Sequence, residues 1–169
     1  MNFDGLTSVV IVSDHASLRT DDGTWEFWGK LIAAPAADYG FMGKEAAGNN
    51  DGEIWLSASS DRKAHFALND GLADKATDTN YVLTLDIWYH IVGTFGASGM
   101  KHYINGAEEG THVYTGGVAA YVHNIAIGMR RVDGWPLNCC ITQVKIYNYA
   151  LSAAAIYKRF QAERRLFSV

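Results

Sequence analysis

Hydrophobic and polar residues along the chain form short runs separated by turn residues, which is the pattern of an all-β protein. The runs expected to form strands cover residues 7–13, 24–33, 39–44, 53–59, 64–68, 88–95, 100–104, 107–114, 123–130 and 137–149. Residues 24–33 are apolar at successive positions, so both faces of that strand are expected to be covered. The pattern predicts closely spaced, sequential hairpins in a β-sandwich.

The pair Asn105-Gly106 is the strongest short hairpin signal in the chain. A two-residue loop at this position pairs Ile104 with Ala107 and Tyr103 with Glu108. It also places His102 opposite Glu109, on the same side as Ile104. We therefore expect His102 to be partly buried and paired with Glu109.

Only the end of the chain has a helical pattern. Ser152 is suited to cap a helix that begins at Ala153. Ile156 and Phe160 lie four residues apart on one helix face, which is expected to dock on the sandwich. We predict one domain over residues 1–169, with the sandwich over about 1–150 and the helix and a basic tail over about 152–169.

Composition supports this class of fold and excludes others. Aromatic residues make up 12% of the 169 residues and there are 17 glycines, which favours strands joined by glycine turns. A net charge of −4 argues against a nucleic-acid binder. No apolar run approaches transmembrane length, and the first residues lack the basic and apolar regions of a signal peptide. We expect no membrane segment and synthesis in the cytoplasm.

The end of the chain carries a local excess of positive charge against the single acid Glu163. The cations are Lys158, Arg159, Arg164 and Arg165. One interpretation is a tail that binds a partner. The other is that cations near the end of a helix complement its dipole.

The two cysteines, Cys139 and Cys140, are adjacent. Neighbouring residues on a strand point to opposite faces, so a disulfide between them would need a distorted backbone. We expect both thiols to be reduced, which fits a reducing compartment.

Four segments of the chain carry a further pattern. They are Phe3-Asp4-Gly5 before an apolar strand, then Thr24-Trp25-Glu26-Phe27-Trp28, then Trp88 to Phe95 with Tyr103-Ile104-Asn105-Gly106, and last Ile127-Gly128 with Ile141 to Ser152. In this order they resemble the laminin-G-like jelly rolls of the concanavalin A-like lectin/glucanase superfamily. The resemblance implies two large antiparallel sheets packed face to face, with the two ends of the chain, around Phe3 and Ile146, as neighbours.

The same resemblance makes calcium a candidate cofactor. Family members often carry an acid just after the Ile of the closing strand, whereas this chain has Thr142 and Gln143, which puts that site in doubt. Oxygen ligands for calcium are also available at Asn49, Asn50 and Asp51. The alternative is that this segment is simply a turn.

Glycoside hydrolases belong to the same superfamily, so catalysis must be tested. Retaining hydrolysis needs two carboxylates that face each other across the scissile bond. The chain has no E-x-D-x-E pattern, and the adjacent Glu108 and Glu109 point to opposite faces. The histidines have no metal-binding spacing. We predict that the protein is not an enzyme.

The candidate ligand-binding segment is residues 129–138, expected to be a loop on a rigid sandwich. A glycan needs an exposed aromatic ring to stack on the sugar and planar polar groups for its hydroxyls. The candidate residues are Arg130, Arg131, Asp133, Trp135 and Asn138, with Tyr121 in the preceding connection. The alternative is that Trp135-Pro136 packs over the end of the sandwich.

Two functions follow from these observations. The first is a non-catalytic recognition module that binds carbohydrate or a protein surface through loops at the sandwich end. The second is a structural subunit of a larger assembly, such as a phage-like capsid decoration or tail protein. The basic tail, the reduced cysteines and the missing signal favour this alternative, in which the partner is a second copy or another assembly component.

Overall fold

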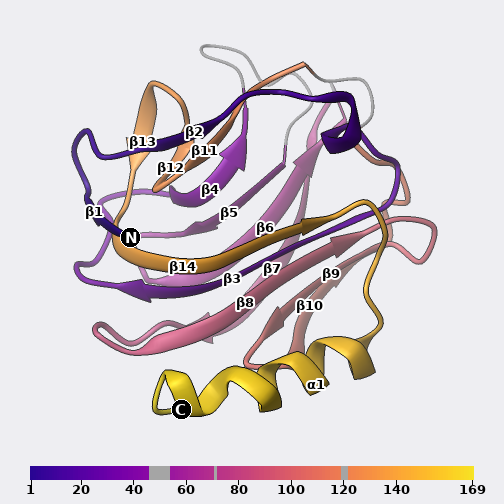
Figure 1. Ribbon diagram of the computed structural model, residues 1–169. Coiled ribbons are helices and arrows are strands. Elements are labelled where there is room, and N and C mark those ends of the chain that lie inside the picture. The colour runs from indigo at the N-terminus through magenta and orange to yellow at the C-terminus, as the bar shows by residue number, and fades with distance from the viewer. Residues whose placement is uncertain (46–53, 71, 119–121) are drawn as a thin grey trace.

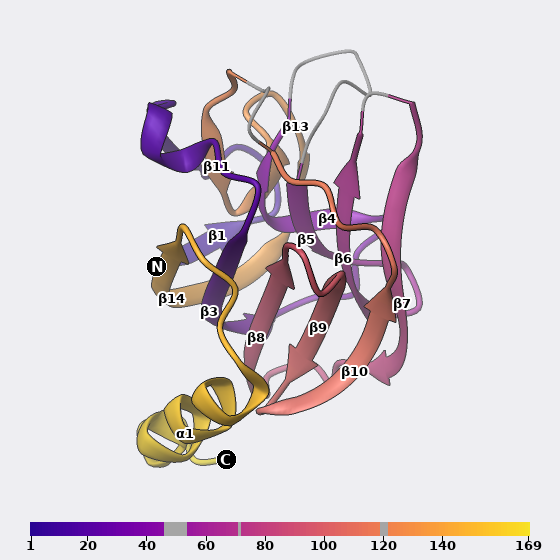
Figure 2. The same ribbon diagram turned by 90° about the vertical axis from the view of Figure 1, so that its right-hand side faces the viewer.

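The computed structural model describes residues 1–45, 54–70, 72–118 and 122–169. Within these ranges, two sheets pack face to face, and one helix lies against the outer face of one sheet (Figures 1 and 2). The prediction of an all-β, two-sheet jelly-roll sandwich with a short C-terminal helix is confirmed.

The first sheet has six strands, and each neighbouring pair is antiparallel. In spatial order they are β1 (Asn2–Asp4), β14 (Asn138–Tyr147), β3 (Gly23–Leu31), β8 (Trp88–Phe95), β9 (Met100–Ile104) and β10 (Ala107–His112). This sheet carries the helix α1 (Ala153–Glu163) on its outer face (Figure 2).

The second sheet has eight strands. Its main path is β12 (Met129–Arg131), β13 (Gly134–Pro136), β4 (Tyr39–Lys44), β5 (Ile54–Ala58), β6 (Lys63–Asn69) and β7 (Asp74–Val82). Off this path, β11 (Ile125–Ile127) pairs with both β4 and β2 (Val10–Val12). Two short 3-10 turns complete the elements, η1 (Ala16–Leu18) and η2 (Arg164–Leu166). Of the described helices, none is long and apolar enough to cross a membrane.

The first strand and the closing strand are neighbours, in keeping with the resemblance. Phe3 on β1 pairs with Cys139 on β14, and the Met1 amino group donates a hydrogen bond to the Ile141 carbonyl at 2.8 Å. Ile146, which was expected near Phe3, instead pairs with Trp25 on β3. Strand β1 is therefore the edge strand of the first sheet, next to β14.

Strand β3 is covered on both faces, as its apolar sequence predicted. Trp25 and Phe27 point into the core between the sheets. Trp28 points outward and stacks on Phe167, with ring centres 4.0 Å apart. Because side chains alternate along a strand, one apolar run supplies both the sandwich core and the seat of the C-terminal segment.

The helix α1 docks by the predicted face. The Ser152 hydroxyl accepts a hydrogen bond from the Ala155 N–H at 3.3 Å and caps the first turn. Ile156 and Phe160 are buried against the sheet. The helical end of the chain is therefore part of the packed structure.

The hairpin at Asn105-Gly106 forms as predicted, since both residues have positive φ values of 51° and 80°. A bulge after Glu108 then places Gly110, not Glu109, opposite His102, so the predicted pairing of His102 with Glu109 is wrong. Among the described residues, neither ring nitrogen of the fully buried His102 has a hydrogen-bond partner. Burial, with a smaller contribution from His65, lowers the pKa of His102 to about 3.

Both cysteines are free thiols. Cys139 is buried in the core, where burial raises the pKa of its thiol. Cys140 is partly exposed and lies 3.4 Å from the Asn2 side-chain oxygen. The two side chains thus point to opposite faces of β14.

Candidate ligand-binding site

The segment 129–138 is not the loop that the sequence predicted but a hairpin, β12–β13, followed by the start of β14. It lies on the face of β4, where Gly40 and Gly43 leave room for it. A Cβ atom on Gly40 would lie 2.3 Å from the Arg130 Cα atom, and one on Gly43 would lie 2.0 Å from the Arg130 carbonyl oxygen. Glycine at both positions lets the hairpin backbone rest directly on the strand.

The side chain of Arg130 anchors the hairpin to the rest of the protein. Its guanidinium carbon lies 3.8 Å from the ring centre of Trp55 and 5.0 Å from that of Trp135. Its Nε donates to Glu45 at 2.5 Å, and its Nη1 lies 3.4 Å from an Asp38 oxygen. The side chains of Arg130 and Glu45 are only 11% and 4% exposed. Arg130 is thus a buried support for Trp135.

In the pair formed by Arg130 and Glu45, burial controls the acidity of the Glu45 carboxyl group. Burial raises the pKa of Glu45 above its ordinary value, although the charge of Arg130 acts in the opposite direction. A buried carboxylate in this position is stable only while Arg130 faces it.

Trp135 is 37% exposed and lines a hollow of about 390 Å³ together with Ala37, Tyr39 and Gly134. We call this space the Trp135 hollow. The backbone of Trp135 has φ of 66°, a left-handed conformation that is rare for a bulky residue. Such strain is often found where a side chain is held in position for a function.

Arg131 and Asp133, the next two predicted site residues, form an ion pair, with Nε and Oδ1 3.1 Å apart. The Arg131 guanidinium carbon lies 5.9 Å from the ring centre of Trp135. Asp133 lines a second hollow of about 320 Å³ with Leu6, Val9 and Pro136.

Asn138 lines a third hollow of about 210 Å³, which we call the Asn138 hollow. Its walls include Asp4, Ala34, Tyr39 and Pro136. Tyr39 belongs to both this hollow and the Trp135 hollow. The structure therefore brings five of the six predicted ligand-binding residues to one region, while Tyr121 lies outside the described residues, as do the calcium candidates Asn49, Asn50 and Asp51.

Sequence reasoning missed Tyr39 on β4, Glu45 directly after β4, and Trp55 on β5. One signal was present: Gly40 and Gly43 interrupt a strand, and glycine inside a strand marks a close approach of another backbone. That signal predicts a neighbour but does not identify it.

The basic tail is docked along the fold. Arg159 lies 3.7 Å from Glu26 and over the ring of Tyr147, and Arg164 lies over the ring of Phe160. Lys158, Arg164 and Arg165 are nevertheless exposed. Of the four predicted partner-binding cations, only Arg159 is partly buried against the protein.

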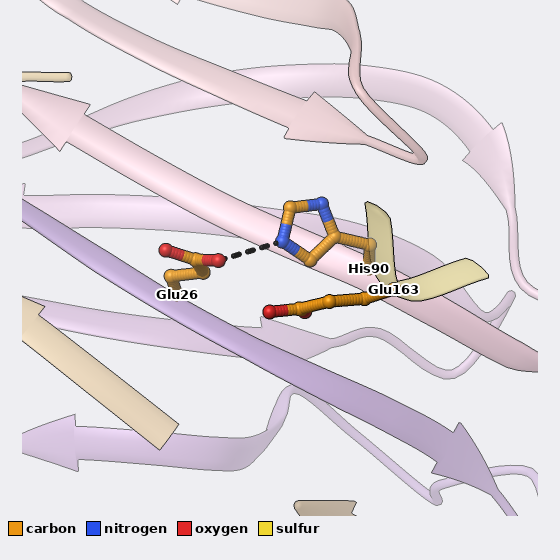
Figure 3. A group of neighbouring side chains, drawn as sticks. All are labelled: Glu26, His90 and Glu163. Carbon is orange, nitrogen blue, oxygen red and sulfur yellow. Dashed lines mark hydrogen bonds and ion pairs between the residues drawn. The ribbon is translucent and has the colours of Figure 1, made fainter. Parts of the chain in front are cut away.

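A second cluster lies beneath the helix, where Glu26, His90 and Glu163 converge (Figure 3). Their ligand atoms lie within 4.8 Å of one another, and His90 Nε2 is 3.1 Å from Glu26 Oε1. Their residue types suit a metal ion, but Lys145 Nζ already lies 2.7 Å from Glu163 and 3.3 Å from Glu26.

We interpret this cluster as an ion network that fastens α1 to the sheet. Trp28 also donates to Glu163 at 2.7 Å. Burial alone would raise the pKa of Glu26, but the His90 hydrogen bond and the Lys145 charge hold it below its ordinary value. The network ties strands β3, β8 and β14 to the helix.

Comparison with known families gives one match that covers most of the chain. The family model described as "Concanavalin A-like lectin/glucanases superfamily" matches residues 4–157. No curated protein matches the sequence.

Several solved structures share the fold. Domain 4 of an extracellular arabinanase from Geobacillus stearothermophilus, solved with arabinotriose, has a TM-score of 0.76 at 17% identity, over 93% of this chain and 74% of that chain. The binding domain of Paraclostridial Mosquitocidal Protein 1 has a TM-score of 0.74 at 18% identity, over 95% of this chain and 42% of that chain.

Trypanosoma rangeli sialidase matches all of this chain with a TM-score of 0.69 at 20% identity, but the match spans only 28% of the sialidase. At these identities the likenesses establish a shared fold. The fold thus occurs within glycoside hydrolases, and the prediction that this chain is not an enzyme stays a prediction. The alternative of a virion component gains no support from the family match or from these three structures.

Proposed function

The chain belongs to the concanavalin A-like lectin/glucanases superfamily, and on that premise we propose that it is a non-catalytic carbohydrate-binding module. The proposed site is the Trp135 hollow on the β12–β13 hairpin. The partly exposed indole of Trp135, held in a strained backbone above Arg130, is the observation that carries the proposal.

Aromatic side chains bind sugars through the apolar faces of the sugar rings. Trp135 and Tyr39 line the same hollow, so a bound ring would meet aromatic surface from two elements. Because the ion-paired Arg130 supports Trp135, little side-chain freedom remains to be lost on binding, which favours affinity.

Two of the similar structures agree with this proposal. The arabinanase domain was solved with a bound oligosaccharide, and the mosquitocidal protein segment is described as a binding domain. Each of these two structures aligns with nearly the whole of this chain.

The non-catalytic part of the proposal rests on the carboxylates near the hollow. Hydrolysis of a glycosidic bond needs one carboxylate free to act as an acid and a second as base or nucleophile. Here Glu45 and Asp38 face Arg130, and Asp133 faces Arg131. Each of these carboxylates already faces an arginine. Glu45, whose pKa burial raises, is only 4% exposed, which leaves it poorly placed to reach a bound sugar.

Titration calorimetry with arabinotriose and a panel of other oligosaccharides tests the proposal. We expect binding by the natural chain and at least a tenfold loss in Trp135→Asn. Asparagine is chosen because, glycine apart, it is among the residues that best tolerate the left-handed backbone at this position. Tyr157→Ala, which removes another exposed aromatic residue on α1, should leave binding unchanged.

Failure of every oligosaccharide to bind would contradict the proposal, as would equal binding by Trp135→Asn. Release of reducing sugar from the same panel, abolished by Asp38→Asn or Asp133→Asn, would contradict its non-catalytic part.

A further inference from the structure

The Trp135 hollow and the Asn138 hollow adjoin each other. Tyr39 forms a wall of both, and Pro136, next to Trp135, lines the Asn138 hollow. They are nevertheless distinct spaces, of about 390 and 210 Å³. A ligand that fills both hollows would therefore place one sugar in each.

The charges around these hollows are mostly compensated and leave an acidic excess. Arg130 faces Glu45 and Asp38, and Arg131 faces Asp133, so three acids surround two cations. Asp4 adds a further negative charge in the Asn138 hollow, where one of its oxygens accepts backbone N–H groups from Leu6, Thr7 and Ser8.

Among the residues that line the Trp135 hollow, none is charged. The segments outside the described residues, 46–53, 71 and 119–121, contain no Lys, Arg or His. A carboxylated or sulfated sugar would therefore find no free cation there and would lie close to several acids. The cost of placing an anion at such a site opposes its binding.

We propose that the site selects a neutral oligosaccharide of at least two residues, with one sugar stacked in the Trp135 hollow and the next in the Asn138 hollow. This inference rests on the proposed function and adds the charge and the length of the ligand. The Asn138 amide both donates and accepts hydrogen bonds, which suits sugar hydroxyls. Tyr39 lies between the two positions and would contact both sugars.

The length of the ligand is tested by calorimetry with arabinose, arabinobiose and arabinotriose, and with the matching glucose and cello-oligosaccharide series. We expect the disaccharide or trisaccharide of the preferred series to bind at least tenfold more tightly than its monosaccharide. Asn138→Ala should weaken the oligosaccharide at least fivefold and leave the monosaccharide unaffected. Trp135→Asn should weaken both.

The charge of the ligand is tested with trigalacturonic acid and sialyllactose at the same ionic strength. We expect each to bind at least tenfold more weakly than the best neutral trisaccharide. Asp133→Asn releases Arg131 and should narrow that gap, whereas Glu108→Gln, which releases Lys101 on the other sheet, should not.

The outcomes separate the two proposals. Preference for an acidic sugar, or a monosaccharide as tight as its oligosaccharide, would overturn this inference and leave a carbohydrate-binding module. Absence of binding to every sugar would overturn the proposed function and this inference together.

Discussion

The guanidinium carbon of Arg130 lies 5.0 Å from the ring centre of Trp135. Both residues were predicted to contact a ligand, and in the structure the buried Arg130 lies behind the partly exposed Trp135. Cation–π contact of this kind contributes about 0.5–2 kcal/mol, depending on desolvation. Arg130 would therefore affect ligand binding indirectly, by fixing the position of the Trp135 ring.

We expect Arg130→Ala to lower the free energy of unfolding by about 3–5 kcal/mol, because it leaves the buried Glu45 carboxylate without its cation. Urea denaturation at pH 7 measures the change. Arg131→Ala is the matched control, since its pair with the 53% exposed Asp133 should contribute only about 0–1 kcal/mol.

The double variant Arg130→Ala, Glu45→Gln tests the cause. Removal of the stranded charge should restore part of the lost stability. A double variant as unstable as Arg130→Ala alone would mean that lost packing against Trp55, and not the charge, explains the effect.

His102→Leu should stabilise the protein. A buried imidazole without a hydrogen-bond partner costs about 1–3 kcal/mol, and leucine removes both polar atoms. Denaturation at pH 7 should show a higher free energy of unfolding for the variant. A lower value would indicate that the ring packs too well against Phe66 to be replaced.

The stability of the natural chain should also fall in acid because of His102. Its pKa is about 3 in the folded protein and about 6.5 in the unfolded chain, so the unfolded chain binds the proton more readily between these values. The free energy of unfolding should fall by about 1.4 kcal/mol per pH unit below about pH 6.5 from this group alone.

The His102→Leu variant lacks that contribution, so its advantage over the natural chain should widen as the pH falls from 6.5 toward 4. Denaturation curves at several pH values give the two slopes. Parallel slopes would show that His102 is not kept neutral by the core.

Phe160→Ala should weaken the docking of α1 and cost about 3–5 kcal/mol, because Phe160 is 7% exposed and packs on Trp28. Tyr157→Ala on the exposed side of the same helix should cost less than about 1 kcal/mol. Tryptophan fluorescence during urea denaturation reports both. Equal effects would mean that the helix is not held by its buried face.

Gly43→Ala should displace the β12–β13 hairpin, since the new methyl group would lie 2.0 Å from the Arg130 carbonyl oxygen. We expect a loss of about 1–3 kcal/mol in stability and weaker arabinotriose binding. Gly134→Ala is the control for stability, because its new methyl group would meet only the Arg131 side chain, at 3.1 Å. A fully stable Gly43→Ala variant would contradict the close seating of the hairpin.

Much of the sandwich could be predicted from local patterns. The ranges of β4, β8 and β9 agree with the expected strands, because apolar runs and glycine turns mark their ends. Strand β7 was missed because most of its residues, from Asp74 to Asn80, are polar and do not form an apolar run. It is also an edge strand of the second sheet, where a polar sequence is tolerated.

The candidate site was found only in part, for a related reason. Arg130, Arg131, Asp133 and Trp135 are close in sequence, so one segment contains them. Glu45 is 85 residues from Arg130 and reaches it only because β4 and β12 cross. Local patterns report how a segment folds, whereas the burial of Arg130 depends on a contact between distant segments.

The two glycines of β4 divide the β12–β13 hairpin into two parts. The part packed on them must keep its sequence, whereas the residues beyond it can be substituted. Gly40 and Gly43 contact the backbone of Arg130, while Val132 and Asp133 form the turn beyond it. In both views the hairpin lies far from α1 (Figures 1 and 2). A library that varies residues 132–135 while retaining Arg130, displayed through a C-terminal fusion, would offer a route to binders of new specificity on this scaffold.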